Sequence, residues 1–228
     1  MKSVMIVTVT LLIVAFFVTY VSAQGIVAKG FKGGLNLANV RGENFEDADS
    51  RLGFAIGGFV TYGLNKQFSL RPEIYYTAKG CKLKAKGSES DVDYEVSYSM
   101  EGSVSLNYLE IPVFGVFAVN KNINLFAGPY LDIYLNGKVK SEYEVHTRYL
   151  DPSINEWVTE DESGSDSEDI KSDDMNSPGF GLLFGAEYLI GKISIGARYS
   201  IGLSNIPDDD EEDAKHKVIQ FLVGFHLP

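Results

Sequence analysis

The stretch Phe68–Tyr76, F-S-L-R-P-E-I-Y-Y, alternates between apolar and polar side chains. Leu70 and Ile74 share one parity, whereas Arg71 and Glu73 share the other. Because successive side chains of a β-strand point to opposite faces of its sheet, this stretch predicts a strand with one apolar face and one charged face. A chain built from such strands must bury one face and expose the other.

The same alternation recurs along the chain and predicts eight strands. They are expected at residues 28–40, 51–64, 68–79, 103–119, 123–135, 178–190, 193–203 and 217–227.

The connections between these strands alternate in length. Short turns are expected at residues 65–67, 120–122 and 191–192, and the longest polar connections are residues 80–102 and 136–177. Outer-membrane barrels have short periplasmic turns, longer external loops and both chain ends in the periplasm. We therefore expect an all-β fold: an eight-stranded antiparallel up-and-down transmembrane β-barrel with short periplasmic turns and long external loops. Its apolar faces would meet lipid, and its charged faces would meet in the lumen.

Residues 1–23 resemble a secretory signal peptide. Lys2 is followed by the almost uninterrupted apolar run Val4–Val21, and Val-Ser-Ala at 21–23 is a small-residue cleavage site. An uncleaved helical anchor is the alternative, since the run is nearly long enough to span a bilayer. We expect a cleaved signal peptide at 1–23 and one outer-membrane barrel domain at 24–228. No later run of about 18 apolar residues suggests a helical span.

Composition supports export to a membrane. The net charge of -11 makes nucleic acid a poor partner, because its binding favours basic surfaces. The 14 Phe and 13 Tyr suit the aromatic girdles of a transmembrane barrel, and the 23 Gly suit crowded places inside it. Cys81 is the single cysteine, so we expect a free or partly buried thiol and no internal disulfide.

Seven charged residues are expected on the lumen faces. An eight-stranded barrel is only wide enough for side chains to fill it, and buried charges must pair to offset their desolvation. We therefore predict a paired structural network, with a selectivity ring or a proton path as the alternative. Its members are Lys32, Arg71, Glu73, Glu110, Asp132, Glu187 and Arg198.

A two-residue turn at Gly191-Lys192 predicts the register of the last hairpin but one, with Ile190 opposite Ile193. Counting outward makes Glu187 and Arg198 diagonal neighbours, close enough for two long side chains to meet.

Two acidic stretches, Glu156–Asp174 and Asp208–Asp213, are expected in external loops. Carboxylates suit Ca²⁺, but neither stretch contains a D-x-D-x-D-G loop, so we expect solvated, flexible segments and no metal or other cofactor. By contrast, alternation at Tyr94, Val96 and Tyr98 suggests strands that project beyond the membrane.

The three histidines, His146, His216 and His226, are scattered along the chain. A hydrolase needs a base held beside its nucleophile, and the spacing provides none, so the sequence does not predict an enzyme.

Several segments resemble the PorT-like family of Gram-negative outer-membrane β-barrel proteins. They are G-F-K-G-G-L-N-L at 30–37, F-S-L-R-P-E-I-Y-Y-T-A-K-G at 68–80, L-N-Y-L-E-I-P at 106–112, G-P-Y at 128–130 and I-S-I-G-A-R-Y-S-I-G-L-S-N-I at 193–206. The resemblance covers most of the barrel and implies the same fold. For some members it also implies a role in assisting protein export.

The sequence therefore predicts an outer-membrane barrel with a packed lumen, embedded in the lipid bilayer, that acts through external loops or an unknown protein partner. A narrow channel and a soluble lipocalin-like carrier are the alternatives.

Overall fold

A computed structural model describes residues 25–42, 45, 48–151, 153–154, 156–207 and 213–228. The expected signal peptide and residues 208–212 of the second acidic stretch lie outside the described residues.

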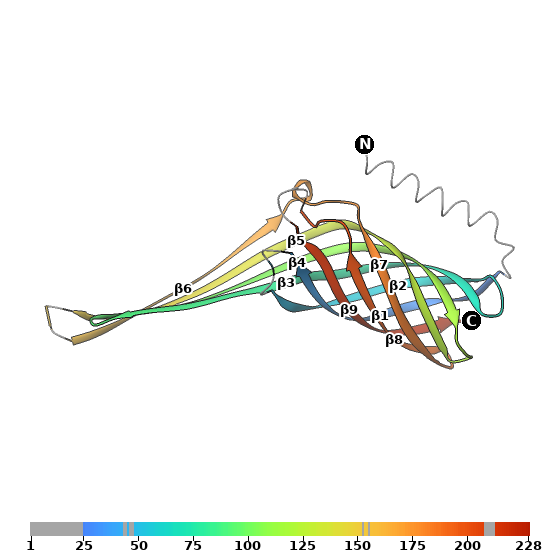
Figure 1. The fold of residues 1–228 in the computed structure, drawn as a ribbon, viewed down its shortest axis with the longest axis horizontal. Helices are drawn as coiled ribbons and strands as arrows, with labels where there is room; N and C mark the ends of the chain where they lie inside the picture. The colour runs from blue at the N-terminus through green and yellow to red at the C-terminus, as the bar shows by residue number, and fades with distance from the viewer. Residues whose placement is uncertain (1–24, 43–44, 46–47, 152, 155, 208–212) are drawn as a thin grey trace.

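The described chain is almost entirely β-structure (Figure 1). A short 3₁₀ helix is η2 (Ser172–Asp174), and no described helix is long and apolar enough to cross a membrane. The strands are β1 (Ile26–Arg41), β2 (Asp49–Gly63), β3 (Phe68–Asp91), β4 (Tyr94–Ala118), β5 (Ile123–Asp151), β6 (Glu156–Ile170), β7 (Gly179–Ile190), β8 (Ile193–Gly202) and β9 (Lys215–Leu227).

Eight of these strands form a closed antiparallel ring. Each pairs with its neighbour in the order β1, β2, β3, β4, β5, β7, β8, β9, and β9 pairs back to β1. The predicted eight-stranded up-and-down barrel is confirmed. Its C-terminus lies at the end with the short turns, opposite the sheet that projects from the other end (Figure 1).

The hairpin of β7 and β8 has the predicted register. Ile190 pairs with Ile193, Glu187 with Gly196, and Gly185 with Arg198. Gly191 has a φ of 61°, which the first position of such a tight turn requires and which glycine adopts without strain.

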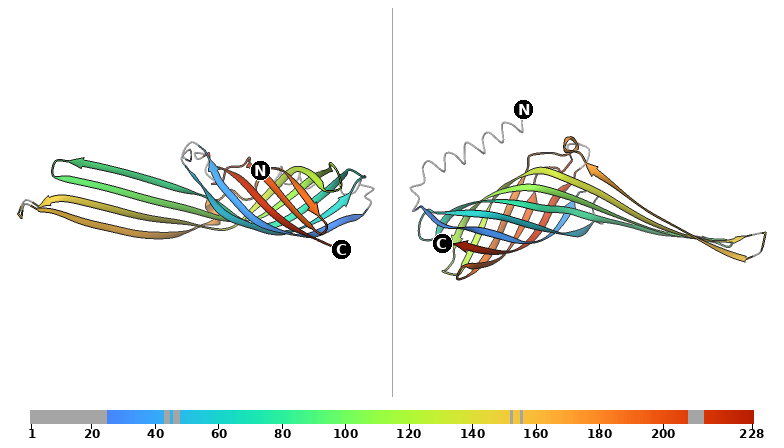
Figure 2. Two further views of the ribbon diagram at one scale, coloured as in Figure 1. Left: turned by 90° about the horizontal axis from the view of Figure 1, so that it is seen from below. Right: turned by 180° about the vertical axis from the view of Figure 1, so that it is seen from behind.

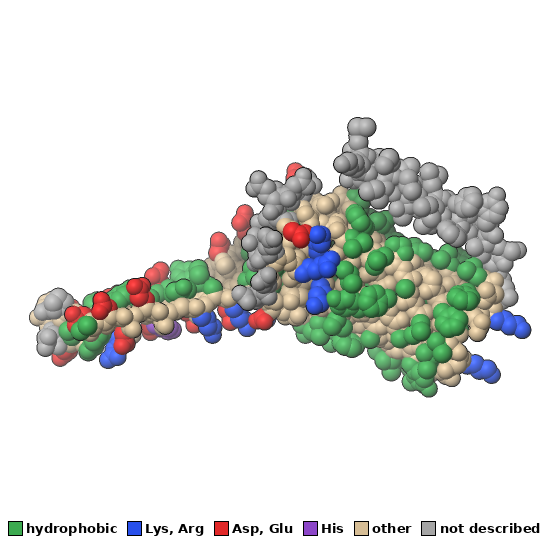
Figure 3. All heavy atoms as spheres, in the orientation of Figure 1, with side chains coloured by type: hydrophobic (Ala, Val, Ile, Leu, Met, Phe, Trp, Pro, Cys, Tyr) green, Lys and Arg blue, Asp and Glu red, His purple; other side chains and the backbone are tan. Residues whose placement is uncertain are grey.

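The two faces of the barrel wall differ in polarity. On β1, Phe31 and Leu35 are 62% and 54% exposed on the outside, while Lys32 and Asn36 are buried inside. Apolar side chains are spread over the outer surface of the barrel in the space-filling view (Figure 3). A lipocalin-like carrier would place its apolar face inward, so this arrangement argues against that alternative.

The barrel continues at one end into a long projecting sheet, which we call the extension (Figures 1 and 2). It consists of residues 82–101 of β3 and β4 and residues 138–169 of β5 and β6. β3 and β4 stay paired to a tight turn at Asp91 and Tyr94, and β4 stays paired with β5 as far as Tyr149. The connection expected at 80–102 is therefore two continuous strands.

The acidic stretch Glu156–Asp174 is mostly strand β6, and the expectation of a flexible loop was wrong. β6 pairs with β5 without a break, from Gly137 opposite Ile170 to Asp151 opposite Glu156. The ladder satisfies the backbone groups on the edge of β6 that faces β5, and cross-strand pairs such as Lys138–Asp169 at 3.3 Å bring opposite charges together.

Candidate functional site: the charged lumen

The seven charged residues predicted for the lumen all lie inside the barrel. None is more than 5% exposed: Lys32, Arg71, Glu73, Glu110, Asp132, Glu187 and Arg198.

Lys79 is an eighth charged residue of the lumen, which sequence reasoning missed. It is fully buried, and it was expected at the end of a strand that in fact continues to Asp91. Lys79 shares the parity of Arg71 and Glu73 on β3, so the alternation itself contained the signal. With Lys79 included, four cations face four carboxylates.

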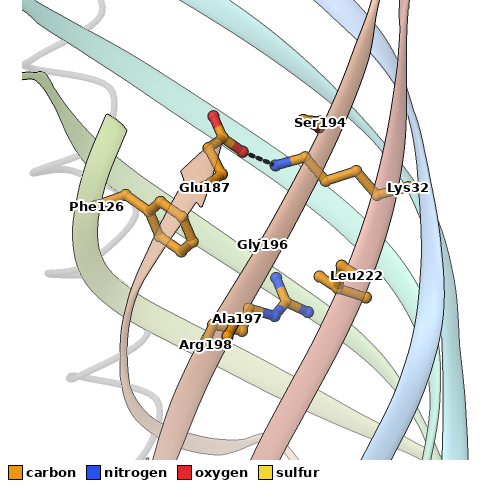
Figure 4. Close-up of a pocket in the computed structure, with 8 residues that line it drawn as sticks. All are labelled: Lys32, Phe126, Glu187, Ser194, Gly196, Ala197, Arg198 and Leu222. Atoms are coloured by element: carbon orange, nitrogen blue, oxygen red, sulfur yellow. Dashed lines mark hydrogen bonds and ion pairs between the residues drawn. The ribbon is translucent and has the colours of Figure 1, made fainter. Parts of the chain in front are cut away.

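At the end of the barrel near the short turns, Lys32 and Arg71 share two carboxylates. Lys32 Nζ lies 3.0 Å from Glu73 Oε1 and 2.9 Å from Glu187 Oε2, the contact marked in Figure 4. Arg71 Nε lies 3.0 Å from Glu73 Oε1, and Arg71 Nη1 lies 2.5 Å from Glu187 Oε1. Glu73 and Glu187 therefore each contact both Lys32 and Arg71.

The same network continues toward the extension. Arg198 Nη1 is 3.1 Å from Glu73 Oε2, and its Nη2 is 2.9 Å from Glu110 Oε1. Lys79 Nζ is 2.8 Å from Glu110 Oε2 and 2.6 Å from Asp132 Oδ2. Arg198 links Glu73 to Glu110, and Glu110 in turn contacts Lys79. All eight charges therefore form one connected set.

Arg198 does not have the partner that sequence analysis assigned to it. It pairs with Glu73 on β3 and Glu110 on β4, and Nε donates to Gln220, whereas Glu187 pairs with Lys32 and Arg71. The prediction that Glu187 and Arg198 would meet as diagonal neighbours considered only adjacent strands. In a narrow lumen a long side chain reaches strands on the far wall, where several acceptors can surround it.

Aromatic rings fill the space around the cations. The Arg198 guanidinium lies 4.3 Å from the Tyr75 ring centroid, and Arg71 lies 4.9 Å from that of Phe126. Lys79 lies 4.9 Å from the ring of Tyr130. Such contacts favour a desolvated cation, so they add to the ion pairs that offset burial.

The network borders a small cavity. A cavity of about 10 Å³, roughly the room that one water needs, is lined by Lys32, Phe126, Glu187, Ser194, Gly196, Ala197, Arg198 and Leu222 (Figure 4).

The end of the lumen nearest the extension is closed by apolar side chains. Tyr108 and Tyr134 pack with Met175, which follows η2, and with Ile170 and Ile206. The charges therefore lie beneath an apolar layer.

The remaining sequence candidates lie apart from one another. Cys81 is buried, His216 bonds the Tyr108 hydroxyl at 3.1 Å, and the His226 ring packs against Phe59 at 5.0 Å. Within the described residues, no group of three or more His, Cys, Asp and Glu side chains could hold a metal ion.

His146 lies on the extension, in a row across β4, β5 and β6 that resembles a catalytic triad. It is opposite Ser97 and Asp161, and its Nδ1 lies 2.7 Å from Asp161 Oδ1. This hydrogen bond raises the pKa of His146. Both side chains are more than half exposed, whereas the Asp of a Ser-His-Asp triad is buried beside its His, so this row does not have the geometry of that triad.

Comparison of this chain with known proteins identifies a matching family. The family model described as "Outer membrane protein beta-barrel domain" matches residues 22–208. A search of curated proteins found no match.

Solved structures with similar folds include Ail, the attachment invasion locus protein of Yersinia pestis. It is 15% identical with a TM-score of 0.43, and the alignment covers 88% of this chain and 98% of Ail. For Neisserial surface protein A the identity is 12%, the TM-score 0.38 and the coverages 89% and 99%. For CarO2 of Acinetobacter baumannii they are 10%, 0.32, 90% and 100%.

Proposed function

The chain belongs to the outer membrane protein β-barrel domain family, and from this premise we propose that it is a closed barrel whose function lies in the sheet it holds outside the membrane. The barrel would act as a rigid anchor, and the extension would meet a protein partner.

The observation that carries the closed-barrel proposal is the single network of eight buried charges. An ion passing through would have to separate pairs that are 2.5 to 3.1 Å apart, in a lumen also packed with aromatic rings. Removing one partner of a buried pair costs about 3–5 kcal/mol, so transient opening is disfavoured. The apolar layer of Tyr108, Tyr134 and Met175 adds a second obstruction.

The extension supports the partner-binding part of the proposal. No described residue from Lys82 to Glu101 or from Lys138 to Asp169 is buried, so this sheet has no core and both faces are available. A single-layer sheet that is not needed to close the barrel suits contact with another molecule.

Planar-bilayer recording of the purified full-length chain tests the closed lumen. We expect no steady conductance, with empty detergent and an open porin as negative and positive controls. Steady openings would overturn the closed-barrel proposal and favour the narrow-channel alternative.

The motifs at 30–37 and 68–80 further support placing the chain among PorT-like members of this family. An export-assisting role is what that resemblance implies, and the extension is the part that a partner on the outside of the membrane would meet. A pull-down from solubilised membranes is therefore the direct way to identify a partner.

A further inference from the structure

The two faces of the extension have opposite chemistry. We call the face continuous with the lumen the inner face and the face continuous with the lipid-facing wall the outer face. Strand register places Met100 opposite Tyr143, Tyr98 opposite Val145, and Tyr94 opposite Tyr149, all on the inner face. These six side chains, which we call the aromatic stripe, run along the two central strands.

Two tyrosines of the stripe lie flat across the neighbouring strands. A Cβ added to Gly87 on β3 would lie 2.4 Å from Tyr98 Cζ, and one added to Gly164 on β6 would lie 2.6 Å from Tyr143 Cε1. The rings therefore occupy the space that the glycines leave open. Tyr98 remains 44% exposed, so its ring covers the glycine and is still open to solvent.

Carboxylates border the stripe on both edges. On β3 they are Glu89 and Asp91, and on β6 they are Glu160, Glu162, Asp166 and Glu168. Tyr149 donates to Glu160 at 3.0 Å, which ties the stripe to this border.

The described inner face of the extension carries no Lys, Arg or His. By the same register, the basic residues of the extension lie on the outer face: Lys82, Lys84, Lys86, Lys138, Lys140, His146 and Arg148. There they have acidic partners, as in Lys138–Asp169 and Arg148–Glu95. The border carboxylates on the inner face have no cation beside them on that face.

Resting on the proposed function, we propose that the inner face of the extension is the docking surface for a cationic polypeptide segment. Open aromatic rings attract guanidinium and ammonium groups, and carboxylates on both borders add complementary charge. A second copy is disfavoured, because stacking two inner faces would oppose carboxylate borders. Lipid is disfavoured because the outer face of the same strands is charged, which places the extension beyond the membrane.

The test compares two double variants that remove the same charge from opposite faces. Glu89→Gln with Glu162→Gln changes the inner face, and Glu101→Gln with Glu144→Gln changes the outer face. The full-length chain in zwitterionic nanodiscs is titrated against a labelled peptide of alternating arginine and threonine, with binding followed by fluorescence anisotropy. Heat-modified migration on SDS gels confirms that every variant is folded.

We expect the inner-face variant to weaken binding by about tenfold, and the outer-face variant to change it by less than about twofold. A Tyr98→Ser and Tyr143→Ser variant should also weaken binding, although it leaves the charge unchanged. No binding by the wild-type chain, or equal losses from both charge variants, would overturn the proposal. So would self-association that depends on the inner-face carboxylates, because the occupant would then be a second copy.

The two proposals fail separately. Loss of face-specific binding would leave the closed lumen untouched, whereas steady conductance would overturn the closed lumen without altering the peptide measurement.

Discussion

The barrel and the extension share strands β3, β4 and β5, yet the basic residues of these strands change face between them, from the inside of the barrel to the outer face of the extension. On β3, Arg71 and Lys79 point into the lumen while Ile74 meets the lipid side. Beyond Cys81, the inner side carries Leu83 and the outer side carries Lys84. The register of β3 and β4 continues without a shift, whereas β5 shifts by one residue between Tyr134 and Asn136. On β3, therefore, the difference reflects what surrounds each part.

This difference follows from the surroundings of the charged side chains in each part. In the barrel lipid surrounds the wall, so polar groups must gather inside and satisfy one another. In the extension water surrounds both faces, so charged side chains can occupy the outer face, and the aromatic stripe lies on the inner face between its carboxylate borders. From this change we expect the outer boundary of the membrane near residues 81–83 of β3.

The largest expected change in stability comes from a substitution in the lumen. Arg198→Ala removes the partner of Glu73 and Glu110 and leaves a cavity, so it should lower the free energy of unfolding by about 4–5 kcal/mol. The denaturant midpoint of heat-modifiable folding measures this loss. Adding Glu110→Gln should recover part of it, and the outward change Tyr199→Phe should be nearly silent. A harmless Arg198→Ala would mean that the lumen charges do not depend on each other.

The next prediction compares the same substitution in both regions of one strand. Lys79→Met leaves Glu110 and Asp132 buried with one fewer cation and should cost about 3 kcal/mol. On the extension, Lys84→Met breaks an exposed 3.4 Å contact with Asp49, the first residue of β2, and should cost about 0–1 kcal/mol. Both are measured from urea midpoints in the same lipid. Equal losses would show that the extension is as tightly coupled to stability as the lumen.

The smallest expected effect is a pH dependence confined to the extension. Asp161 raises the pKa of His146 above its ordinary value, so this pair favours β5–β6 pairing most below the ordinary histidine pKa. That contribution should be lost as pH rises through the raised pKa. We expect NMR titration of His146 to show the raised pKa, Asp161→Asn to lower it, and the barrel midpoint to stay constant over this range. An unchanged His146 titration in Asp161→Asn would contradict the assignment.

Much of the fold was predictable because alternation is a local property. The parity of Phe31 and Lys32 on β1 is enough to assign outside and inside, and eight such segments with alternating connection lengths predict the barrel. The glycine turn at 191 likewise predicts the pairing of Ile190 with Ile193. These features depend on neighbouring residues in the chain.

The extension was predicted only in part. Alternation at Tyr94 and Tyr98 suggested projecting strands, but the acidic composition of Glu156–Asp174 suggested a flexible loop. An acidic composition indicates that a segment has little apolar area to bury. Strand β6 does not depend on apolar burial, because backbone hydrogen bonds to β5 and cross-strand charge pairs hold it in place. A strand of this kind is visible only once its neighbour is known.

The sequence by itself determined which side chains enter the lumen, because each backbone step in a strand reverses the direction of the side chain. Only the tertiary structure decided which of those charges pair. Arg198 meets Glu73 and Glu110, residues 125 and 88 positions away in the chain, because closure of the ring brings opposite walls together. The stagger of strands around a closed ring sets these contacts, and no local pattern of residues records it.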